Sequence, residues 1–342
     1  MNRRKFIRQT AAATGGLLIL QDLYARHKGK VYGHHDMRYV LDTTWSRADP
    51  ARFPVNDCHE MVQDRRGRIL LLTNETHNNV LIYNTRGKLL ASWGHEFPGG
   101  HGLTIHDENG REFLYITDIV RHEVYKATLD GQILLTIKAP LDAGGIYKKP
   151  EEFVPTETVI DENGDIFIAD GYGAQYVLHY DARGNLKNYF GGRGEGEEHF
   201  DNAHGICFDT RRGDSSLLVT DRTRNCFKRF SREGRLLEVI HLPGACVCRP
   251  VIQGDHLYAA VLRSPDLNAE GTGFVTILDR ENRVVSNIGG TEPQYVNGQL
   301  QPMRQAEKIF IHPHDVCVDR DHNLYVAQWA SGKVYPYKLK RV

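Results

Sequence analysis

Short apolar runs alternate with polar turns along almost the whole chain. A recurring unit starts with a polar residue and an aliphatic pair, passes through a turn, and continues into further short apolar strands. Many of the turns carry Asp-Gly, Arg-Gly or Glu-Gly pairs, which favour tight hairpins between antiparallel strands. Each unit is therefore predicted to be a four-stranded antiparallel meander.

The unit recurs six times. Its first strands are expected to begin at His59, His101, Thr156, His204, Arg249 and His314. One such sheet cannot bury both of its faces, so the sheets must pack against one another in a ring. The sequence therefore predicts an all-β fold, a six-bladed β-propeller spanning residues 27–342.

The ends of the chain are expected to meet in the last blade. The sixth unit shows only three strands, and the segment 39–44 is a suitable fourth. This N-terminal strand would close the ring. The polar stretch 291–307 between the fifth and sixth units is expected to form a loop over one face.

Residues 1–26 have the features of an export signal. Arg3 and Arg4 precede Phe6 and the weakly apolar run 11–20, a combination typical of twin-arginine signals. The apolar run is too short to span a bilayer. We therefore expect a periplasmic or secreted protein without stable membrane insertion after signal removal. The alternative is a chance basic start before a first helix.

Charge argues against nucleic-acid binding. The 43 basic and 43 acidic residues give a formal net charge of zero, so no field would attract a polyanion. The basic pair Arg211 and Arg212 is expected in a solvated turn. The six cysteines are too few for a dense disulfide framework, and no bridge is assigned. We expect a monomer that takes a small-molecule or peptide substrate.

Four of the six units place a histidine immediately before the first apolar strand. These residues are His59, His101, His204 and His314. The innermost strand of each blade lines the channel of a propeller, so equal positions in different units become neighbours. Three neutral imidazoles around an axis suit Zn²⁺ and leave a coordination position open. The alternative is a repeated structural histidine that bonds a neighbouring carbonyl.

Several short motifs make the pattern more specific. The segments HGLT (101–104), DGY (170–172), AHG (203–205) with TDR (220–222), and PHDV (313–316) together resemble the peptidyl-α-hydroxyglycine amidating lyases. That family consists of six-bladed propellers with NHL repeats, which split a hydroxyglycine-extended peptide into a peptide amide and glyoxylate. The resemblance covers roughly residues 50 to 340.

The resemblance implies two metal sites. The zinc ligands of the family fall on His101, His204 and His314. A structural calcium would be held by the Asp315 side chain and by the carbonyls of Leu103 and Met61. Backbone carbonyls are suitable calcium ligands whatever their side chains.

The resemblance also implies catalytic groups. The family's catalytic tyrosine falls on Tyr172 and one active-site arginine on Arg222. A tyrosinate would remove the substrate's hydroxyl proton, so Tyr172 is expected to have a pKa lowered by zinc and by Arg222.

Two positions near the site depart from the family. Asn74 stands where a second active-site arginine is expected, and a neutral amide cannot supply that charge. His59 is an addition that would join the metal site or contact a substrate's acid group. Asn74 remains a candidate substrate contact.

Three functions are therefore compared. The first is a metal-dependent carbon–nitrogen lyase acting on an α-hydroxy amide. The second is a non-catalytic NHL propeller that binds a peptide, glycan or protein at its channel face. The third, a lactonase-like hydrolase with a central calcium, is disfavoured because the equivalent positions are rich in histidine rather than Asn or Asp.

Overall fold

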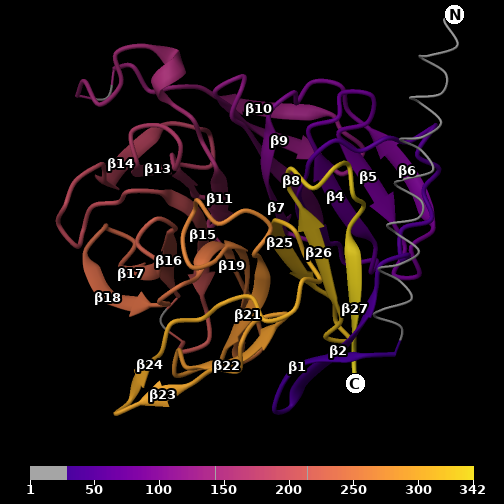
Figure 1. The fold of residues 1–342 in the computed structure, drawn as a ribbon. Coiled ribbons are helices and arrows are strands. Elements are labelled where there is room, and N and C mark those ends of the chain that lie inside the picture. Colours follow the sequence, from indigo (N-terminus) through magenta and orange to yellow (C-terminus); the bar gives the residue numbers. More distant parts are fainter. Residues whose placement is uncertain (1–28, 143, 214) are drawn as a thin grey trace, which may run out of the picture.

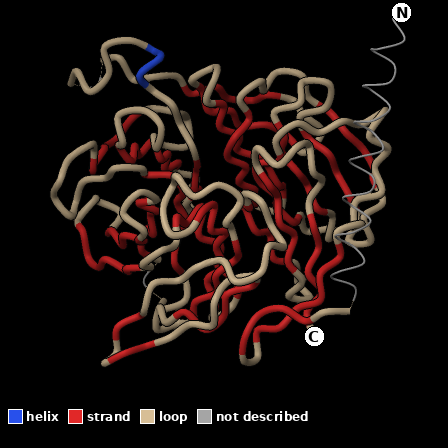
Figure 2. The backbone as a smooth tube through the Cα atoms, viewed as in Figure 1, coloured by secondary structure: helices blue, strands red, loops and turns tan. Residues whose placement is uncertain are grey.

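The structure is a computed structural model that describes residues 29–142, 144–213 and 215–342. The predicted export signal at 1–26 lies outside these residues. Six antiparallel sheets stand around a central axis (Figure 1), which confirms the predicted six-bladed β-propeller. Strands make up nearly all of the regular structure, and the one helical turn described is Pro150–Glu152 (Figure 2). Within the described residues, no helix has the length and apolar character needed to cross a membrane.

Five blades each consist of four consecutive strands. Blade 1 contains β3 (Cys58–Gln63), β4 (Ile69–Thr73), β5 (Val80–Tyr83) and β6 (Leu89–Trp93), and blade 2 contains β7 (Gly100–Glu108), β8 (Arg111–Asp118), β9 (Glu123–Thr128) and β10 (Ile133–Ile137). Blade 3 contains β11 (Glu157–Ile160), β12 (Ile166–Ala169), β13 (Tyr176–Tyr180) and β14 (Leu186–Gly191). Blade 4 contains β15 (Ala203–Asp209), β16 (Ser216–Asp221), β17 (Cys226–Phe230) and β18 (Leu236–His241). Blade 5 contains β19 (Cys246–Gln253), β20 (His256–Arg263), β21 (Phe274–Leu278) and β22 (Val284–Ile288).

The sixth blade joins the two ends of the described chain. Its inner strands are β25 (Pro313–Val318), β26 (Leu324–Gln328) and β27 (Tyr337–Arg341), and β2 (Met37–Asp42) pairs with β27. This confirms the expected closure by an N-terminal strand. A further strand, β1 (Val31–His34), extends the same sheet outward.

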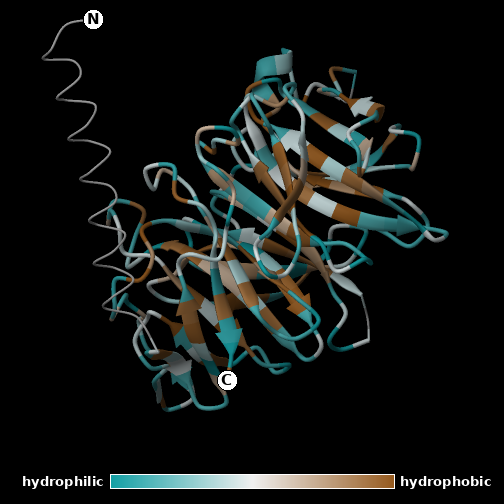
Figure 3. Cartoon of the chain, turned by 90° about the vertical axis from the view of Figure 1, so that its right-hand side faces the viewer, coloured by the Kyte–Doolittle hydropathy of each residue, from teal (hydrophilic) through white to brown (hydrophobic). Residues whose placement is uncertain are grey.

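The apolar core lies between the blades. The buried apolar side chains form one large cluster at each of the six interfaces between neighbouring blades. The strand β4 inside blade 1 is buried along its whole length, whereas the outermost strands β6 and β18 are partly exposed. Figure 3 shows the hydrophobic residues within the strands and hydrophilic residues in many of the turns. Because the core is distributed around the ring, the axis is lined by the first strand of each blade. Each of these strands lies against the next in a closed circle: β3, β7, β11, β15, β19 and β25.

The structure adds a detail to one local expectation and shows that another was wrong. The stretch 291–307 is a loop interrupted by a small hairpin, β23 (Tyr295–Val296) and β24 (Gln299–Leu300). Arg211 is buried, not solvated, because its guanidinium donates two hydrogen bonds to the Asp209 carboxylate, at 2.9 and 2.7 Å.

Candidate functional site

A β-bulge turns each of the four histidines toward the axis. The pairing register between the first and second strands shifts at His59, and again across the segments that contain His101, His204 and His314. A bulge adds one unpaired residue to a strand and re-aims its side chain. The repeat therefore delivers an imidazole to the channel from four different blades.

The four imidazoles form a compact, buried group. Their side chains belong to residues that are only 1% to 3% exposed. The ring centroids of His101 and His314 lie 4.8 Å apart. Each of these two rings lies 4.9 to 5.0 Å from both His59 and His204. The four rings thus form a rhombus. His101 and His314 lie at the two ends of its short diagonal, and His59 and His204 lie at the two remaining corners.

This rhombus contains two overlapping sets of three histidines. The set predicted from the sequence is His101, His204 and His314. Candidate ligand atoms of His59, His101 and His314 all lie within 4.8 Å of one another. His59, expected as an addition, therefore lies inside the group that could hold a metal ion.

Hydrogen bonds set the orientation of the two central rings. His101 Nδ1 donates to the carbonyl of Thr156 at 2.9 Å, and His314 Nδ1 donates to the carbonyl of His59 at 3.2 Å. A carbonyl can only accept, so in the neutral rings the lone pair is on Nε2. This is the usual outer contact of a metal-binding histidine. Nδ1 of His59 and of His204 has no hydrogen-bond partner among the described residues.

The protein environment keeps these histidines uncharged. Burial lowers the pKa of His101, His204 and His314 well below the ordinary value, and the charge on Arg222 lowers it further. Burial lowers the pKa of His59 to about 4, although Asp57 opposes the change. Neutral imidazoles are the form that binds a metal ion.

Tyr172 covers this group from the turn between β12 and β13. Its hydroxyl lies 3.3 Å from His101 Nε2 and 3.1 Å from His204 Nε2. The residue is 39% exposed, so one part of the ring faces solvent while the hydroxyl points inward. Gly171 allows this approach, because a Cβ there would lie 2.2 Å from the carbonyl oxygen of Ala203.

Asp170 holds the turn that carries Tyr172. Its carboxylate accepts hydrogen bonds from the backbone N–H groups of Val154 and Ala174, both at 2.6 Å, and from the Tyr147 hydroxyl at 2.7 Å. Burial raises the pKa of Asp170 to about 7, against these hydrogen bonds. The position of the tyrosine hydroxyl is therefore fixed by buried polar contacts.

Arg222 approaches the same hydroxyl from the end of β16. Its Nη1 donates to the Tyr172 hydroxyl at 3.3 Å, and its Nη2 donates to Cys248 Sγ at 3.2 Å. Burial raises the pKa of Tyr172, whereas Arg222 acts to lower it. The expected lowered pKa is thus not produced by the protein groups alone.

Asn74 does not replace the missing arginine. Its side-chain oxygen accepts hydrogen bonds from Asn56 Nδ2 at 3.0 Å and the Asp57 N–H at 2.9 Å, and its Nδ2 donates to the Asp57 carboxylate at 3.2 Å. The side-chain amide of Asn74 is therefore engaged by Asn56 and Asp57. Arg65 cannot supply the absent positive charge either, because it lies at the opposite end of the channel, where it lines a separate cavity.

The fifth blade contributes Cys248 to the histidine level. Val251 pairs with Tyr258 as Val62 pairs with Leu70, so Cys248 is the counterpart of His59. The expected start of this unit at Arg249 was therefore wrong by one residue. The apolar pattern around CVCRPV did not reveal the bulge, and only strand pairing does so.

The three groups predicted to hold calcium are already occupied by a side chain of this protein. Arg249 donates to the carbonyls of Leu103 and Met61, at 2.8 and 3.1 Å, and to both oxygens of Asp315, at 3.1 and 2.8 Å. A guanidinium and a calcium ion cannot share this space. The predicted calcium site does not fit this structure.

Curated relatives include amidating lyases. The chain is 26% identical over 280 residues to peptidyl-α-hydroxyglycine α-amidating lyase 1 of Drosophila melanogaster, which covers 73% of this chain and 47% of that protein. It is 38% identical over 118 residues to a protein named as a probable amidating lyase of the same type in Caenorhabditis elegans, covering 34% and 31%. The chain thus spans about half the length of the first relative and less of the second.

Other comparisons concern the repeat and the fold. The chain is 22% identical over 233 residues to NHL repeat-containing protein 3 of Homo sapiens, covering 60% of this chain and 67% of that protein. A solved streptogramin B lyase superposes with a TM-score of 0.59 at 13% identity, covering 88% of this chain and 97% of that one. No family model matches the sequence.

The order of strands shows a six-bladed β-propeller. Its sequence is similar to peptidyl-α-hydroxyglycine α-amidating lyases and to an NHL repeat-containing protein.

Proposed function

We propose that this protein is a metal-dependent carbon–nitrogen lyase that cleaves peptidyl-α-hydroxyglycine, or a related α-hydroxy amide, to an amide and glyoxylate. The observation that carries the proposal is the convergence on one tyrosine hydroxyl. His101, His204 and Arg222 all lie within 3.3 Å of the Tyr172 hydroxyl. A buried hydroxyl among neutral imidazoles and one guanidinium is suited to proton transfer beside an anionic substrate.

The metal ion that we propose for this site is zinc. His101, His204 and His314 are the proposed ligands, with His59 as an additional one. Support comes from their neutral state, from the fixed Nδ1 hydrogen bonds of His101 and His314, and from the unpartnered Nδ1 atoms of His59 and His204. A bound zinc ion would act as a Lewis acid on a hydroxyl or carboxylate oxygen of the substrate.

Tyr172 carries the proton in both directions once its hydroxyl is ionised, which would require the positive charge of the bound metal ion in addition to Arg222. Tyr172, as the tyrosinate, takes the proton from the substrate's α-hydroxyl. The hydroxyl oxygen then forms the carbonyl of glyoxylate while the C–N bond breaks. The same tyrosine returns the proton to the departing amide nitrogen, so atoms and charge balance. Arg222 remains charged throughout and stabilises the tyrosinate.

One arginine limits the strength of substrate binding. Asn74 contacts Asn56 and Asp57, so it contributes no positive charge to the substrate's carboxylate. We infer that the substrate's carboxylate is held by Arg222 and the metal site. A neutral α-hydroxy amide, which lacks that carboxylate, should therefore lose less binding affinity here than at a site with two arginines. The nearby His59 would supply a further contact.

Metal content and glyoxylate release test the proposal together. We expect about one zinc per chain in the purified mature protein, and glyoxylate release from a peptidyl-α-hydroxyglycine. His101→Ala and His314→Ala should lose both, since these rings belong to both histidine sets. His106→Ala is the matched control, because His106 lies on the same strand β7 outside the group and is partly buried.

The outcomes separate the two remaining functions. Tightly bound metal with glyoxylate release supports the lyase. Protein without tightly bound metal, and without activity after zinc is added, would exclude it and favour a non-catalytic propeller that binds a partner at its channel face. His59→Ala and His204→Ala, compared for metal content, show which ring completes the ligand set.

Cellular location is part of the same proposal. We propose that the segment 1–26 directs export through the twin-arginine pathway and that the mature protein acts as a periplasmic or secreted monomer. The basis is the Arg3-Arg4 pair followed by a short apolar run. Replacing both arginines with lysine should retain the protein in the cytoplasm, measured by cell fractionation, with no change in its blades.

A further inference from the structure

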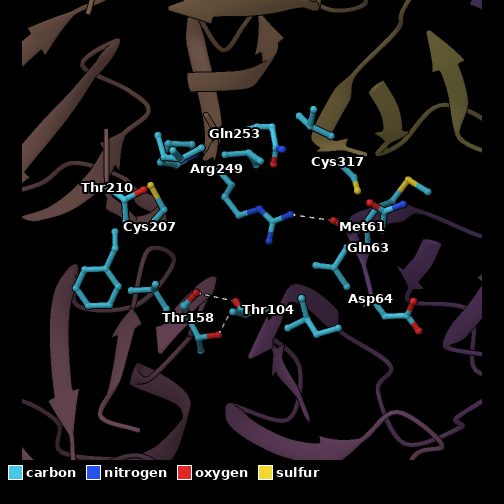
Figure 4. A pocket seen from close by; sticks show the side chains of 18 of the residues that line it. Met61, Gln63, Asp64, Thr104, Thr158, Cys207, Thr210, Arg249, Gln253 and Cys317 are labelled. Carbon is cyan, nitrogen blue, oxygen red and sulfur yellow. Dashed lines mark hydrogen bonds between the residues drawn. The ribbon is translucent and has the colours of Figure 1, made fainter. Parts of the chain in front are cut away.

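A second layer of inward residues lies directly below the histidines. It holds one residue from each blade: Glu60, Gly102, Glu157, Gly205, Arg249 and Asp315. Three carboxyl groups therefore face one guanidinium at the axis. In Figure 4 the Arg249 side chain extends into the centre of the channel toward Met61.

Arg249 links its own blade to four others. Its Nη1 donates to the Leu103 carbonyl at 2.8 Å and lies 3.1 Å from Glu60 Oε2. Its Nη2 donates to the Met61 carbonyl at 3.1 Å, and the Asp315 carboxylate accepts from Nη2 and Nε. A longer ion pair, at 3.6 Å, joins Nε to Glu157. The guanidinium thus bonds blades 1, 2 and 6 and pairs with blade 3.

The surrounding residues leave room for this arginine. A Cβ on Gly205 would lie 2.5 Å from the Arg249 Cα, so blade 4 must carry glycine at this level. The carboxylates are fixed in turn by backbone donors: Leu103 N–H donates to Glu60 at 2.7 Å, and Met61 N–H donates to Asp315 at 2.9 Å. The arginine therefore lies in a formed cradle.

The charges account for a cation at this place. Burial alone would lower the pKa of Arg249, but the carboxylates of Asp315, Glu60 and Glu157 raise it well above the ordinary value. Burial raises the pKa of Glu60 and of Glu157, and Arg249 acts in the opposite direction on both. Without a central positive charge, buried carboxylates would remain uncompensated, which is strongly unfavourable.

We propose that Arg249 is a built-in cation that takes the place of a structural calcium ion, so that the layer of the channel below the histidines is held together without a divalent metal. The Arg249 guanidinium contacts the same three groups, Asp315, Leu103 and Met61, that the resemblance to the amidating lyases assigns to calcium. Side chain and ion are alternatives, because both fill one position with positive charge.

The proposal predicts that removing the guanidinium creates a calcium site. Chelator-stripped wild-type protein should bind no calcium at the channel centre, and millimolar calcium chloride should leave its unfolding temperature unchanged. Arg249→Ala opens the cradle, keeps the carboxylates and carbonyls, and should bind one calcium per chain by titration calorimetry. Its unfolding temperature should be lower than that of wild type and should rise by about 5 °C with saturating calcium.

Two variants control for unspecific effects. Arg229→Ala removes another buried arginine, which pairs with Asp209, and should destabilise the protein without creating a calcium response. The double variant Arg249→Ala/Asp315→Asn should lose the calcium binding gained by the single variant.

The wild-type measurement does not depend on whether any variant folds. Calcium that copurifies with wild type at one ion per chain, and whose removal lowers the unfolding temperature, would overturn the proposal. A folded Arg249→Ala protein with no calcium response would do the same. Neither readout uses glyoxylate release, so this inference and the proposed lyase activity can fail separately.

Discussion

Tyr172 is the residue whose place in the fold decides most about the chemistry. Its hydroxyl contacts two imidazoles and one guanidinium, while part of its ring remains open to solvent. A substrate approaching this face of the propeller therefore meets the tyrosine before the histidines. Burial raises the pKa of the Tyr172 hydroxyl, and the charge on Arg222 only partly offsets this change.

Replacing this hydroxyl tests its proposed role. Tyr172→Phe should lower the rate of glyoxylate release by roughly 100-fold or more, since it removes the group that takes the proton. The metal content should stay the same, because the tyrosine is not a proposed ligand. Tyr189→Phe, on the exposed part of β14, should leave both quantities unchanged. An unaltered rate in Tyr172→Phe would remove the tyrosine from the mechanism.

At the level of strands, the site depends on irregular pairing. Regular pairing would make successive side chains alternate between the two faces of a sheet. The shifts at the start of β3, β7, β15, β19 and β25 break that alternation at one level of the channel. Two consecutive residues per blade then contribute to the axis, one at the histidine level and one at the level of Arg249.

Gly205 tests how closely these strands approach. Gly205→Ala should lower the free energy of unfolding by roughly 1–3 kcal/mol, because its Cβ meets the backbone of Arg249 and must push β15 and β19 apart. Denaturant unfolding measures the change. Gly196→Ala is a suitable control, since its Cβ would meet only the flexible end of the Glu198 side chain. Equal stability of the two variants would contradict the close packing.

At the level of the whole molecule, closure of the ring joins distant segments. The strand β2 supplies the fourth strand of blade 6, and its residues Tyr39 and Leu41 are buried in the cluster between blades 5 and 6. Because the ring is closed, every blade packs against two neighbours and no apolar blade face is left open to solvent. The apolar core therefore lies between the blades, and the axis is available for charged groups.

The contribution of closure is measurable at one side chain. Tyr39→Ala should destabilise the protein by about 3–5 kcal/mol, because it removes a large, fully buried aromatic ring. Tyr189→Ala removes an exposed tyrosine and should cost much less. Thermal and denaturant unfolding provide the comparison, and similar losses in both variants would argue against an essential role for the N-terminal strand.

The repeat made the architecture predictable, because strand length, turn residues and the start of each blade are local properties of the sequence. The histidines were predictable for the same reason: equal positions in a repeat become neighbours in a ring. Cys248 and Arg249 were not, because the bulge in β19 shifts the alignment by one residue and depends on pairing with β20. The contacts of Asn74 with Asn56 and Asp57 also required the folded chain.

The sequence by itself determined the six blades, the N-terminal closing strand and the level at which His59, His101, His204 and His314 meet. Only the tertiary structure decided what occupies the centre below them. A calcium ion and an arginine carry positive charge to the same oxygens, and a ligand list built on Asp315 and backbone carbonyls cannot distinguish them. The position of the Arg249 side chain in that cradle distinguishes them, because its guanidinium already fills the volume that a calcium ion would need.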